Sequence, residues 1–529
     1  MLTRRRNYPV GIQTFSEIIQ GGYVYIDKTD LMWWMQHKRK YIFLSRPRRF
    51  GKSLLSSTLH SFFEGQKDLF KGLKVISMEK EWISYPVIHL DLSIAKGKIS
   101  ANELSETLMW IMQPFCEAYG SGIKEDTPGK MIMDLITRAH QQTGKQVVII
   151  IDEYDAPLLD YLHEEVLNDL RKVMQEFYMP LKAREQDIRF CFITGITKFS
   201  QLSIFSTINN LTNITMWPEF SAICGITEKE LSDQMQEDIE QMAMKYHLSP
   251  DEMHTKLKMH YDGYHFSEDS EEVYNPFSLL KAFDSKKLGK YWFESGTPSF
   301  LIQEMKHFRT DIMSFDQLEV PSTAFDQPTE AMEDALPLLY QSGYLTIKDY
   351  NPELDIYTLS IPNQEVRIGY TKGLLPSHTG LKAADVQTGF AAKFWTALKQ
   401  NDIELAMREM EAYLASLPYV EGFKKKLEDV STAEGFYEWT LYLIFSMLNV
   451  YVRTQVKCAG GWTDMVVWMP DTIYVFELKA DGTAEEALKQ IDDKGYAIPY
   501  TTDKRKVVKV GIAFDTERCT ISSWLTDYN

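Results

Sequence analysis

The sequence predicts an α/β fold in three parts, and three observations lead to that prediction. A short apolar run ends in a basic turn that contains Gly51-Lys52-Ser53, and a helical pattern follows. Five consecutive β-branched residues, Val147–Ile151, run into a pair of carboxylates. Near the C-terminus, apolar strand patterns carry Asp464, Glu477 and Lys479. Unbroken β-branched runs are typical of strands buried on both faces of a parallel sheet.

The first motif has the layout of a phosphate-binding loop between a strand and the N-terminus of a helix. Backbone N–H groups and the helix dipole favour an anion at such a position. Lys52 is expected to reach the terminal phosphates of a nucleotide, and the Ser53 hydroxyl is expected to bind Mg²⁺. Arg46 stands where the usual motif has its first glycine, which leaves turnover of ATP in question. The loop residues predicted to bind the nucleotide are Arg48, Arg49, Gly51, Lys52 and Ser53.

Two carboxylates, Asp152 and Glu153, follow the buried strand at 146–151. In open α/β sheets, ligands lie outside the carboxyl ends of the strands. Asp152 is therefore placed to hold Mg²⁺ through water, and Glu153 is placed to polarise an attacking water. The alternative interpretation is an acidic turn after a core strand, with no ligand.

The order of the neighbouring strands narrows the fold further. One strand pattern at 187–193 ends in Thr194, and another at 85–93 lies between the loop and the acidic strand. This order is typical of the AAA-type branch of P-loop ATPases, in which Thr194 would sense the γ-phosphate. A buried core residue is the alternative for Thr194. The segment 7–40 precedes the loop and is a candidate to cover the base of the nucleotide, with a plain edge element as the alternative.

The second candidate site lies on a helix, three strands, a helix and a further strand near the C-terminus. Glu477 and Lys479 are two residues apart on one strand, so their side chains point the same way, and an antiparallel neighbour can bring Asp464 beside them. The two carboxylates are hard oxygen ligands suited to Mg²⁺. Lys479 can orient or activate the attacking water, while the metal polarises a phosphodiester. This is the pattern of restriction-type nucleases, although an isolated Glu-x-Lys string is more often a surface salt bridge.

Several longer strings stand out along the chain. They are Tyr25–Thr29, Arg46–Ser53, Ile151–Pro157, Thr194–Ser200, Cys224–Glu230, Tyr261–Tyr264, Tyr274–Phe277, Trp292–Gly296, Gln341–Thr346 and Pro362–Glu365. Together they resemble a bacterial family of AAA-ATPase-like proteins whose members carry a C-terminal PD-(D/E)XK nuclease-like domain. The resemblance covers nearly the whole chain, and an arginine at position 46 is common in that family.

The resemblance implies roles for two further residues of the C-terminal domain. Glu434, on the helix before the strands, is implied as an accessory metal or water ligand. Gln490 matches the family's downstream helix string Gln-Ile-x-x-Lys-Gly-Tyr, which ends at Tyr496. The resemblance also implies a helical lid that closes over the nucleotide.

Three domains are expected from these patterns. An AAA-type P-loop ATP-binding domain is expected at 1–215, and a mainly helical lid or winged-helix-like middle region at 216–375. A helical connector and the restriction-endonuclease-like α/β domain are expected at 376–529. In the middle region, the segments 343–348 and 356–361 are expected to pair as strands.

Composition limits the classes of function. The net charge of −17 argues against a generally basic nucleic-acid surface, although a local basic groove is compatible with it. The five cysteines are widely spaced, which favours reduced thiols in the cytoplasm and excludes a zinc module. No apolar run approaches the roughly 18 residues of a membrane span.

The sequence therefore predicts an ATPase coupled to a metal-dependent nuclease, with ATP and Mg²⁺ as cofactors. Nucleic acid is the expected partner, DNA is favoured over RNA, and a homo-oligomer is compatible with the AAA-type fold. One alternative is a switch that binds ATP without turnover and uses its C-terminal fold to grip nucleic acid or a partner protein. Another is an ATPase whose nuclease fold is purely structural.

Overall fold

The structure of the chain is a computed structural model that divides into two compact units. One unit is Met1–Asp311 with Gln317–Glu365, and the other is Ile312–Asp316 with Val366–Asn529. The residues described are 6–120, 126–162, 164–198, 210–294, 301, 304–305, 308, 315, 317–327, 332–369, 390–415, 430–447, 451–458, 460–518 and 520–528. The expected ATP-binding and middle regions thus share one unit, and the division at residue 215 stays a prediction.

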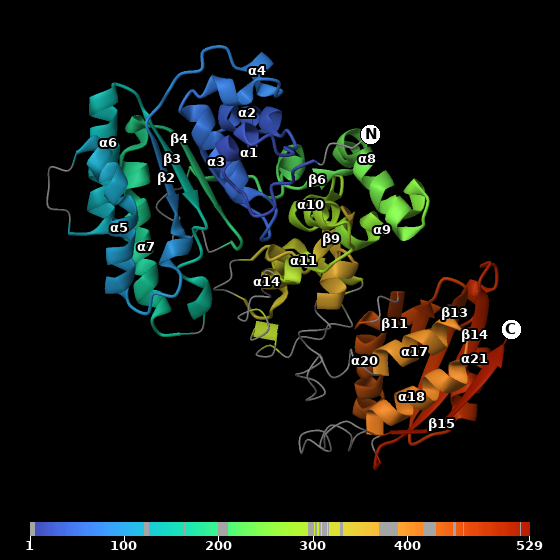
Figure 1. Ribbon diagram of the computed structural model, residues 1–529. Helices are drawn as coiled ribbons and strands as arrows, with labels where there is room; N and C mark the ends of the chain where they lie inside the picture. Colours follow the sequence, from blue (N-terminus) through green and yellow to red (C-terminus); the bar gives the residue numbers. More distant parts are fainter. Residues whose placement is uncertain are drawn as a thin grey trace. The chain divides into compact units, whose positions relative to one another are not determined.

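The first unit is built on a five-stranded parallel sheet with the order β2-β3-β4-β1-β5 (Figure 1). Its strands are β1 (Tyr41–Ser45), β2 (Val87–Asp91), β3 (Val147–Asp152), β4 (Ile188–Gly195) and β5 (Thr212–Asn213). Every residue of β1 and β3 is buried, as their apolar sequences predict. The predicted parallel α/β sheet is confirmed, with the phosphate loop and the acidic pair at the carboxyl ends of β1 and β3.

Helices cover both faces of this sheet (Figure 1). On one face lie α5 (Ala101–Tyr119), α6 (Pro128–Thr143) and α7 (Leu167–Ala183). Apolar residues of α5 recur at Leu104, Leu108, Met112 and Cys116, and this stripe packs into the core. On the other face and beyond it lie α1 (Phe15–Gln20), α2 (Thr29–Lys38), α3 (Lys52–Phe63) and α4 (Val75–Met78).

The rest of the first unit is helical with two small sheets. Its helices are α8 (Glu228–Tyr246), α9 (Pro250–Tyr261), α10 (Pro276–Ser285), α11 (Tyr291–Glu294), α13 (Ser322–Phe325) and α14 (Leu336–Gln341). Its strands are β6 (Ile226–Thr227), β7 (Val273–Tyr274), β8 (Leu318–Pro321), β9 (Thr346–Asn351) and β10 (Ile356–Ser360). Strands β9 and β10 pair antiparallel, which confirms the expected hairpin.

The second unit holds a mixed sheet with the order β11-β12-β13-β14-β15, in which β13 and β14 are parallel and the other pairs antiparallel. The strands are β11 (Tyr451–Cys458), β12 (Gly461–Trp468), β13 (Thr472–Ala480), β14 (Lys506–Asp515) and β15 (Thr520–Tyr528). The helices are α17 (Phe390–Lys399), α18 (Ile403–Ala415), α20 (Val430–Met447) and α21 (Ala484–Lys494). The predicted order of a helix, three strands, a helix and a strand is confirmed, and β15 is an addition to it.

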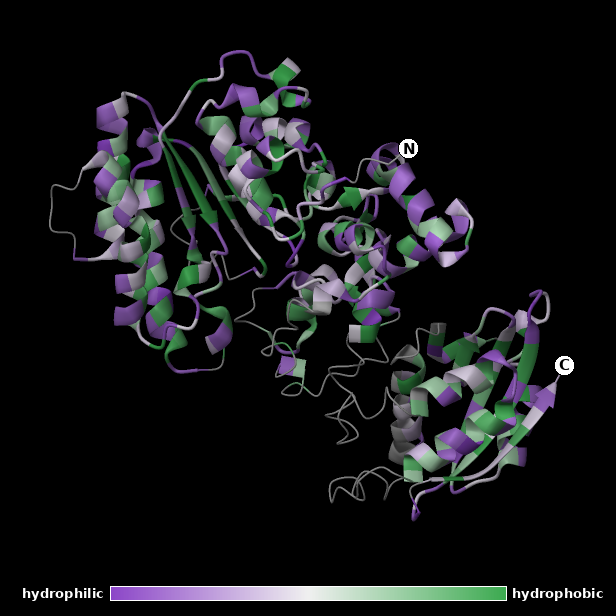
Figure 2. Cartoon of the chain, in the orientation of Figure 1, coloured by the Kyte–Doolittle hydropathy of each residue, from purple (hydrophilic) through white to green (hydrophobic). Residues whose placement is uncertain are grey.

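Each sheet buries its apolar residues under helices. In the second unit, α17, α18 and α20 share an apolar core with one face of the sheet, and α21 packs against the other through Ile491. Figure 2 shows the strands mostly in hydrophobic colours and the outward sides of the helices in hydrophilic ones. Among the helices in the described ranges, none has the length and hydropathy that a bilayer span requires.

Candidate nucleotide and metal sites

The predicted phosphate loop joins the end of β1 to the start of α3. Arg49 and Gly51 have left-handed backbone angles, with φ of 66° and 95°. Glycine adopts this conformation at little cost, so Gly51 turns the chain into the first turn of α3, where Lys52 and Ser53 lie. The backbone N–H groups of this first turn have no partner within the helix, as an anion site requires.

Lys52 is held inside the loop by backbone oxygens. Its ammonium donates to the carbonyls of Arg46 at 3.1 Å and Pro47 at 3.3 Å, and the side chain is almost fully buried. It also lies 3.7 Å from a carboxylate oxygen of Glu153. The structure therefore brings the loop lysine and the acidic end of β3 together, as the spacing of the two motifs predicts.

Asp152 and Glu153 occupy the carboxyl end of β3. Burial raises the pKa of Asp152 to about 6, and a hydrogen bond with Ser53 opposes that rise. Glu153 has a left-handed φ of 50°, and its N–H donates to Asp152 at 2.9 Å. A hydroxyl in contact with a buried carboxylate is a donor set that fits Mg²⁺, so Ser53 and Asp152 could hold the ion together with phosphate and water.

Thr194 lies in β4, inside the sheet. Its side chain is fully buried, and its hydroxyl donates to the carbonyl of Leu44 at 2.7 Å. The hydroxyl is thus engaged between two strands, which is the arrangement expected of a core residue. A role in sensing the γ-phosphate stays a prediction.

Asp155 is a buried residue of this site to which the sequence patterns assigned no role. One of its carboxylate oxygens accepts from the N–H of Ile196 at 3.1 Å and from the N–H and hydroxyl of Thr197, each at 2.7 Å. The nearby Tyr154 hydroxyl donates to the Thr197 carbonyl at 2.9 Å. These bonds tie the acidic end of β3 to the chain after β4. The sequence feature that could have revealed Asp155 is the third carboxylate in the string Asp152-Glu153-Tyr154-Asp155.

Arg46 has a structural role in place of the usual first glycine. Its guanidinium donates to the carbonyls of Ser45, Thr215 and Phe220 at 2.9, 2.8 and 3.1 Å. It also lies 4.2 Å from the centre of the Phe266 ring, and burial lowers its pKa to about 10. The Arg46 side chain therefore points away from the phosphate-binding side of the loop, and its hydrogen bonds connect the loop to the segment after β5.

Aromatic residues of the middle region hold the rest of the loop. Phe50 packs between the rings of Tyr264 and Phe266, with centroids 4.7 and 5.4 Å away. The Arg49 guanidinium lies 4.6 Å from the Phe277 ring. The indole N–H of Trp292 donates to the carbonyl of Arg48 at 3.1 Å. Nucleotide contacts of the Arg48 and Arg49 side chains stay predictions.

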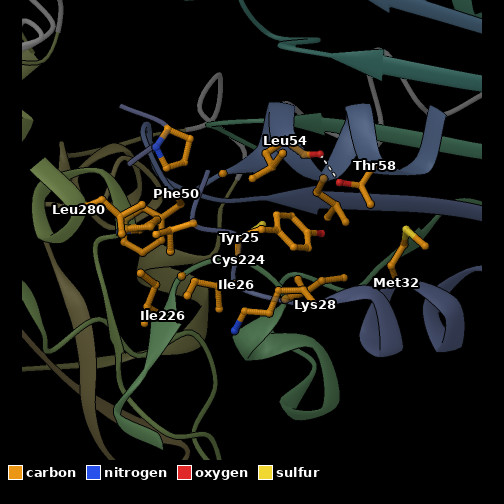
Figure 3. Close-up of a pocket in the computed structure, with 17 residues that line it drawn as sticks. Tyr25, Ile26, Lys28, Met32, Phe50, Leu54, Thr58, Cys224, Ile226 and Leu280 are labelled. Carbon is orange, nitrogen blue, oxygen red and sulfur yellow. Dashed lines mark hydrogen bonds between the residues drawn. The ribbon is translucent and has the colours of Figure 1, made fainter. Parts of the chain in front are cut away.

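An apolar pocket opens beside the loop (Figure 3). Side chains from the segment before α2, from α3 and from the segment around Cys224 face one another there, and Phe50 and Leu280 close one end. Its residues are Pro9, Val24, Tyr25, Ile26, Lys28, Met32, Phe50, Gly51, Leu54, Leu55, Thr58, Ile223, Cys224, Gly225, Ile226, Pro276 and Leu280. A flat apolar ring such as a nucleobase suits this lining.

A polar cavity of about 340 Å³ adjoins the same loop on the side of Ser53 and Asp152. It contains His60 and His89, whose Nδ1 atoms are 3.3 Å apart. Burial, with a contribution from His60, lowers the pKa of His89 to about 4, so His89 is neutral at physiological pH. Asp91 at the end of β2 is the register partner of Asp152 and also lines the cavity. Solvent and cations can therefore reach the Ser53–Asp152 pair from this side.

The second site gathers four of the predicted residues in the C-terminal unit. Asp464 on β12 accepts from the N–H of Leu478 at 2.7 Å, where β12 and β13 part. Glu477 on β13 is 1 % exposed, and its Oε1 lies 3.4 Å from the Lys479 ammonium. Gln490 on α21 donates to the same Oε1 atom. The structure thus brings Asp464, Glu477, Lys479 and Gln490 together.

The carboxylates of this second site repel one another. Burial, with a contribution from the charge of Asp464, raises the pKa of Glu477 to about 8. Burial also raises the pKa of Asp464 to about 6. The buried Oε2 atom of Glu477 has no hydrogen-bond partner among the described residues.

A divalent cation fits the second site. Mg²⁺ commonly binds one or two protein carboxylates and keeps several waters, so the unpartnered oxygen of Glu477 beside Asp464 is a suitable donor set. In the described part of the chain, no group of three or more His, Cys, Asp or Glu side chains is arranged to hold a metal. Asp464 and Glu477 would therefore share the ion with water and substrate.

Glu434 lies on α20 beside this site. Its Oε1 accepts from the N–H of Ala480 at 3.1 Å, and its charge contributes to the raised pKa of Asp464. Its carboxylate thus binds the backbone of β13, and a role as an accessory ligand stays a prediction. One turn further on, Glu438 is buried and accepts two hydrogen bonds of 2.9 Å from Gln455, a contact that no sequence pattern predicted.

Comparisons with known proteins agree with this division. Residues 9–205 match a family model described as "Predicted AAA-ATPase". Residues 432–524 match a model of the PD-(D/E)XK nuclease superfamily. The chain is also 31 % identical, over 537 residues and 99 % of each protein, to an uncharacterized protein in the vnfD 5′ region of Azotobacter chroococcum mcd 1.

Proposed function

Because this chain belongs to the family of AAA-ATPase-like proteins with a C-terminal PD-(D/E)XK nuclease domain, we propose that it couples an ATPase to a metal-dependent nuclease. ATP and Mg²⁺ are the proposed cofactors, and the phosphodiesters of nucleic acid are the proposed substrate. The observation that carries the proposal is the convergence of Asp464, Lys479 and Gln490 on Glu477, whose Oε2 atom is buried and unpartnered among the described residues.

At the first site, the chain's own residues bind and orient the nucleotide. Charged phosphate oxygens are stronger acceptors than carbonyls, so the Lys52 ammonium would exchange its two carbonyl contacts for phosphate. Glu153 would then leave Lys52 and hold the attacking water. The apolar pocket beside Phe50 supports binding of the base. Mg²⁺, when bound at Ser53 and Asp152, would offset the charge of the phosphates.

At the second site, each side chain has a separate task in hydrolysis. Gln490 fixes Oε1 of Glu477 and leaves Oε2 to the cation. The Lys479 ammonium would orient the attacking water and stabilise the negative charge that develops on the phosphate. The bound cation would lower the pKa of the attacking water.

Cleavage assays test this proposal directly. Plasmid DNA and single-stranded RNA are incubated with the purified chain and Mg²⁺ or Mn²⁺, with and without ATP. We expect cutting by the wild type and its loss in Lys479→Ala, with DNA cut in preference to RNA. Failure of well-folded protein to cut any substrate under all of these conditions would refute the nuclease assignment.

Coupling between the two sites is part of the proposal. Lys52→Ala removes the phosphate contact and leaves every residue of the second site in place. We expect this variant to lose the ATP dependence of cleavage while its metal-dependent cutting persists. Identical cutting by the wild type and Lys52→Ala at every ATP concentration would show that the sites act independently.

A non-catalytic switch is the second candidate. The pairing of Lys52 with Glu153 favours it, because the residue that should hold the attacking water is already engaged. Such a protein would bind ATP without turnover and use its nuclease-like domain to hold nucleic acid or a partner protein. Steady-state release of phosphate distinguishes the candidates, since it is expected from the ATPase and absent from the switch.

We also propose an oligomeric state and a cellular location for the protein. AAA-type ATPases often assemble so that a neighbouring copy completes the site, and we propose a homo-oligomer in the cytoplasm. Light scattering with and without ATP tests the assembly. A single monomeric mass under both conditions would overturn it.

A further inference from the structure

Lys457 and Trp462 form an exposed pair on the hairpin of β11 and β12. The two residues lie directly opposite each other in the register of the strands. The Trp462 side chain is 55 % exposed, and the Lys457 ammonium lies 5.7 Å from the centre of its ring. A large apolar side chain that stays open to solvent next to a cation suits an anionic partner with a flat, stackable face.

Trp462 lies close to the metal-binding carboxylates. It precedes Asp464 by two residues on β12, a separation of roughly 7 Å along a strand. Along β12, Trp462 is exposed, Thr463 is buried and Asp464 is half-buried. The backbone of Trp462 therefore lies roughly 7 Å from that of Asp464, beside which the scissile phosphate would bind.

The hairpin is fixed to the same scaffold as the site. A Cβ atom on Gly460 would lie 2.0 Å from the carbonyl of Lys494, so the turn packs tightly against the end of α21. A Cβ atom on Gly461 would lie 3.1 Å from the hydroxyl of Tyr496. The helix α21 also carries Gln490, which binds Glu477. The position of Trp462 relative to the carboxylates is therefore set by packing and not by a free loop.

We propose that Trp462 stacks on an unpaired nucleobase beside the scissile phosphate and that Lys457 binds a neighbouring phosphate. This inference rests on the proposed nuclease function and names the form of its substrate, a strand with at least one unstacked base. Stacking on an indole ring tolerates every base, so the pair would favour single strands, bulges or ends without reading sequence. The net negative charge of the chain repels nucleic acid. A cation next to the ring would therefore contribute more to the affinity for a phosphate.

Binding measurements on the full chain test this inference. Fluorescence anisotropy is recorded in Mg²⁺ with a labelled single-stranded DNA, a single-stranded RNA and a duplex, in a Lys479→Ala background that prevents cutting. We expect Trp462→Ala to weaken single-strand binding by about 5- to 100-fold and duplex binding much less. Trp462→Phe should retain most of the affinity. Lys457→Gln should lower the slope of log affinity against log salt by about 0.7.

A second exposed tryptophan, far from this hairpin in the sequence, serves as the matched control. Trp110 on α5 is 65 % exposed, and Trp110→Ala should leave binding unchanged. Equal single-strand affinities for the background protein and Trp462→Ala would overturn the inference and leave the nuclease proposal standing. Equal losses for single strands and duplex would overturn the stacking role. Absence of binding to every nucleic acid would overturn the inference together with the nuclease proposal.

Discussion

The two candidate sites treat buried charge in opposite ways. In the first unit, the buried charged groups each have several partners in the fold: Arg46 and Lys52 donate to carbonyls, and one oxygen of Asp155 accepts from three donors on Ile196 and Thr197. Nε of Arg46 and the other oxygen of Asp155 have no partner among the described residues. In the second unit, Glu477 is buried next to a second carboxylate, and one of its oxygens has no partner among the described residues. The first arrangement places most of its buried charge against the fold's own groups, whereas the second places two carboxylates side by side, where a cation would fit.

This difference separates the residues that build a site from those that perform its chemistry. Burying an unpaired charge is costly, so a fold retains one where a ligand or a reaction uses it. Removing a charge that the fold surrounds with donors or acceptors, such as Arg46, should therefore lower stability. Removing Glu477, which lies beside a second carboxylate and keeps one oxygen without a partner among the described residues, should lower activity and raise stability. Four experiments test that contrast.

The largest expected effect is on cleavage. Lys479→Ala removes the cation next to Glu477 and should lower the cleavage rate by about 10²- to 10³-fold, because charge that develops on the phosphate loses its partner. The rate is measured by conversion of supercoiled plasmid to nicked circles. Lys504→Ala, at an exposed position of the same unit, serves as control and should cut normally. Similar losses in both variants would contradict an assignment of Lys479 to the site.

Arg46→Ala should cost stability in the first unit. It leaves the carbonyls of Thr215 and Phe220 without their donor and empties a space against Phe266, a loss of roughly 2–4 kcal/mol. Thermal unfolding without nucleotide measures the change. Arg49→Ala is the matched control, because that guanidinium is exposed and stacks on one ring, so it should cost less than about 1 kcal/mol. Equal melting temperatures for the wild type and Arg46→Ala would show that the guanidinium does not support the fold.

Glu477→Gln should have the reverse effect on stability. The pKa of Glu477 rises from its ordinary 4.5 to about 8 in the fold, so the folded chain binds a proton more tightly than the unfolded chain. In a chelator, the contribution that protonated Glu477 makes to the stability of the wild type is complete below about pH 4.5 and is lost as the pH rises from 4.5 through 8. The variant carries no charge at this position, so its thermal unfolding should vary less with pH and exceed the wild type at pH 8 by about 1–3 kcal/mol.

Added Mg²⁺ supplies the second half of that test. The cation should stabilise the wild type at pH 8, where the carboxylates are available to it, and should stabilise Glu477→Gln much less. Parallel pH profiles for the two proteins in chelator, or equal gains from Mg²⁺, would show that the Glu477 carboxylate is not an unmatched charge.

The parts of both sites that follow from local pattern were predictable from the sequence. The glycine turn after an apolar strand and the carboxylates after Val147–Ile151 place Lys52 and Asp152 at one edge of a parallel sheet. The period of a strand places Glu477 and Lys479 together, and an antiparallel neighbour adds Asp464.

The parts that depend on long-range backbone contacts were not predictable. Two of the carbonyls that accept hydrogen bonds from Arg46, those of Thr215 and Phe220, are about 170 residues away in the sequence, and any residue type can supply a carbonyl. Glu434 matches the family pattern for a metal or water ligand, yet its Oε1 atom accepts a hydrogen bond from the backbone N–H of Ala480. Only one residue of strand β15 is buried, so the alternation that would reveal it is weak.

The smallest expected effect is that of Thr194→Val. This substitution distinguishes a core role of Thr194 from a role in sensing the γ-phosphate. Thr194→Val keeps the shape of the side chain and removes its hydroxyl, which donates to Leu44 inside the sheet. If that bond is its whole contribution, the variant should lose roughly 1 kcal/mol of stability and release phosphate from ATP at the wild-type rate. If the hydroxyl senses the γ-phosphate, phosphate release should fall by tenfold or more at unchanged ATP affinity, because hydrogen bonds to charged groups are worth roughly 1.5–3 kcal/mol. Since the hydroxyl is already satisfied within the fold, we expect the first outcome, and this residue then belongs with the matched groups that build the first site.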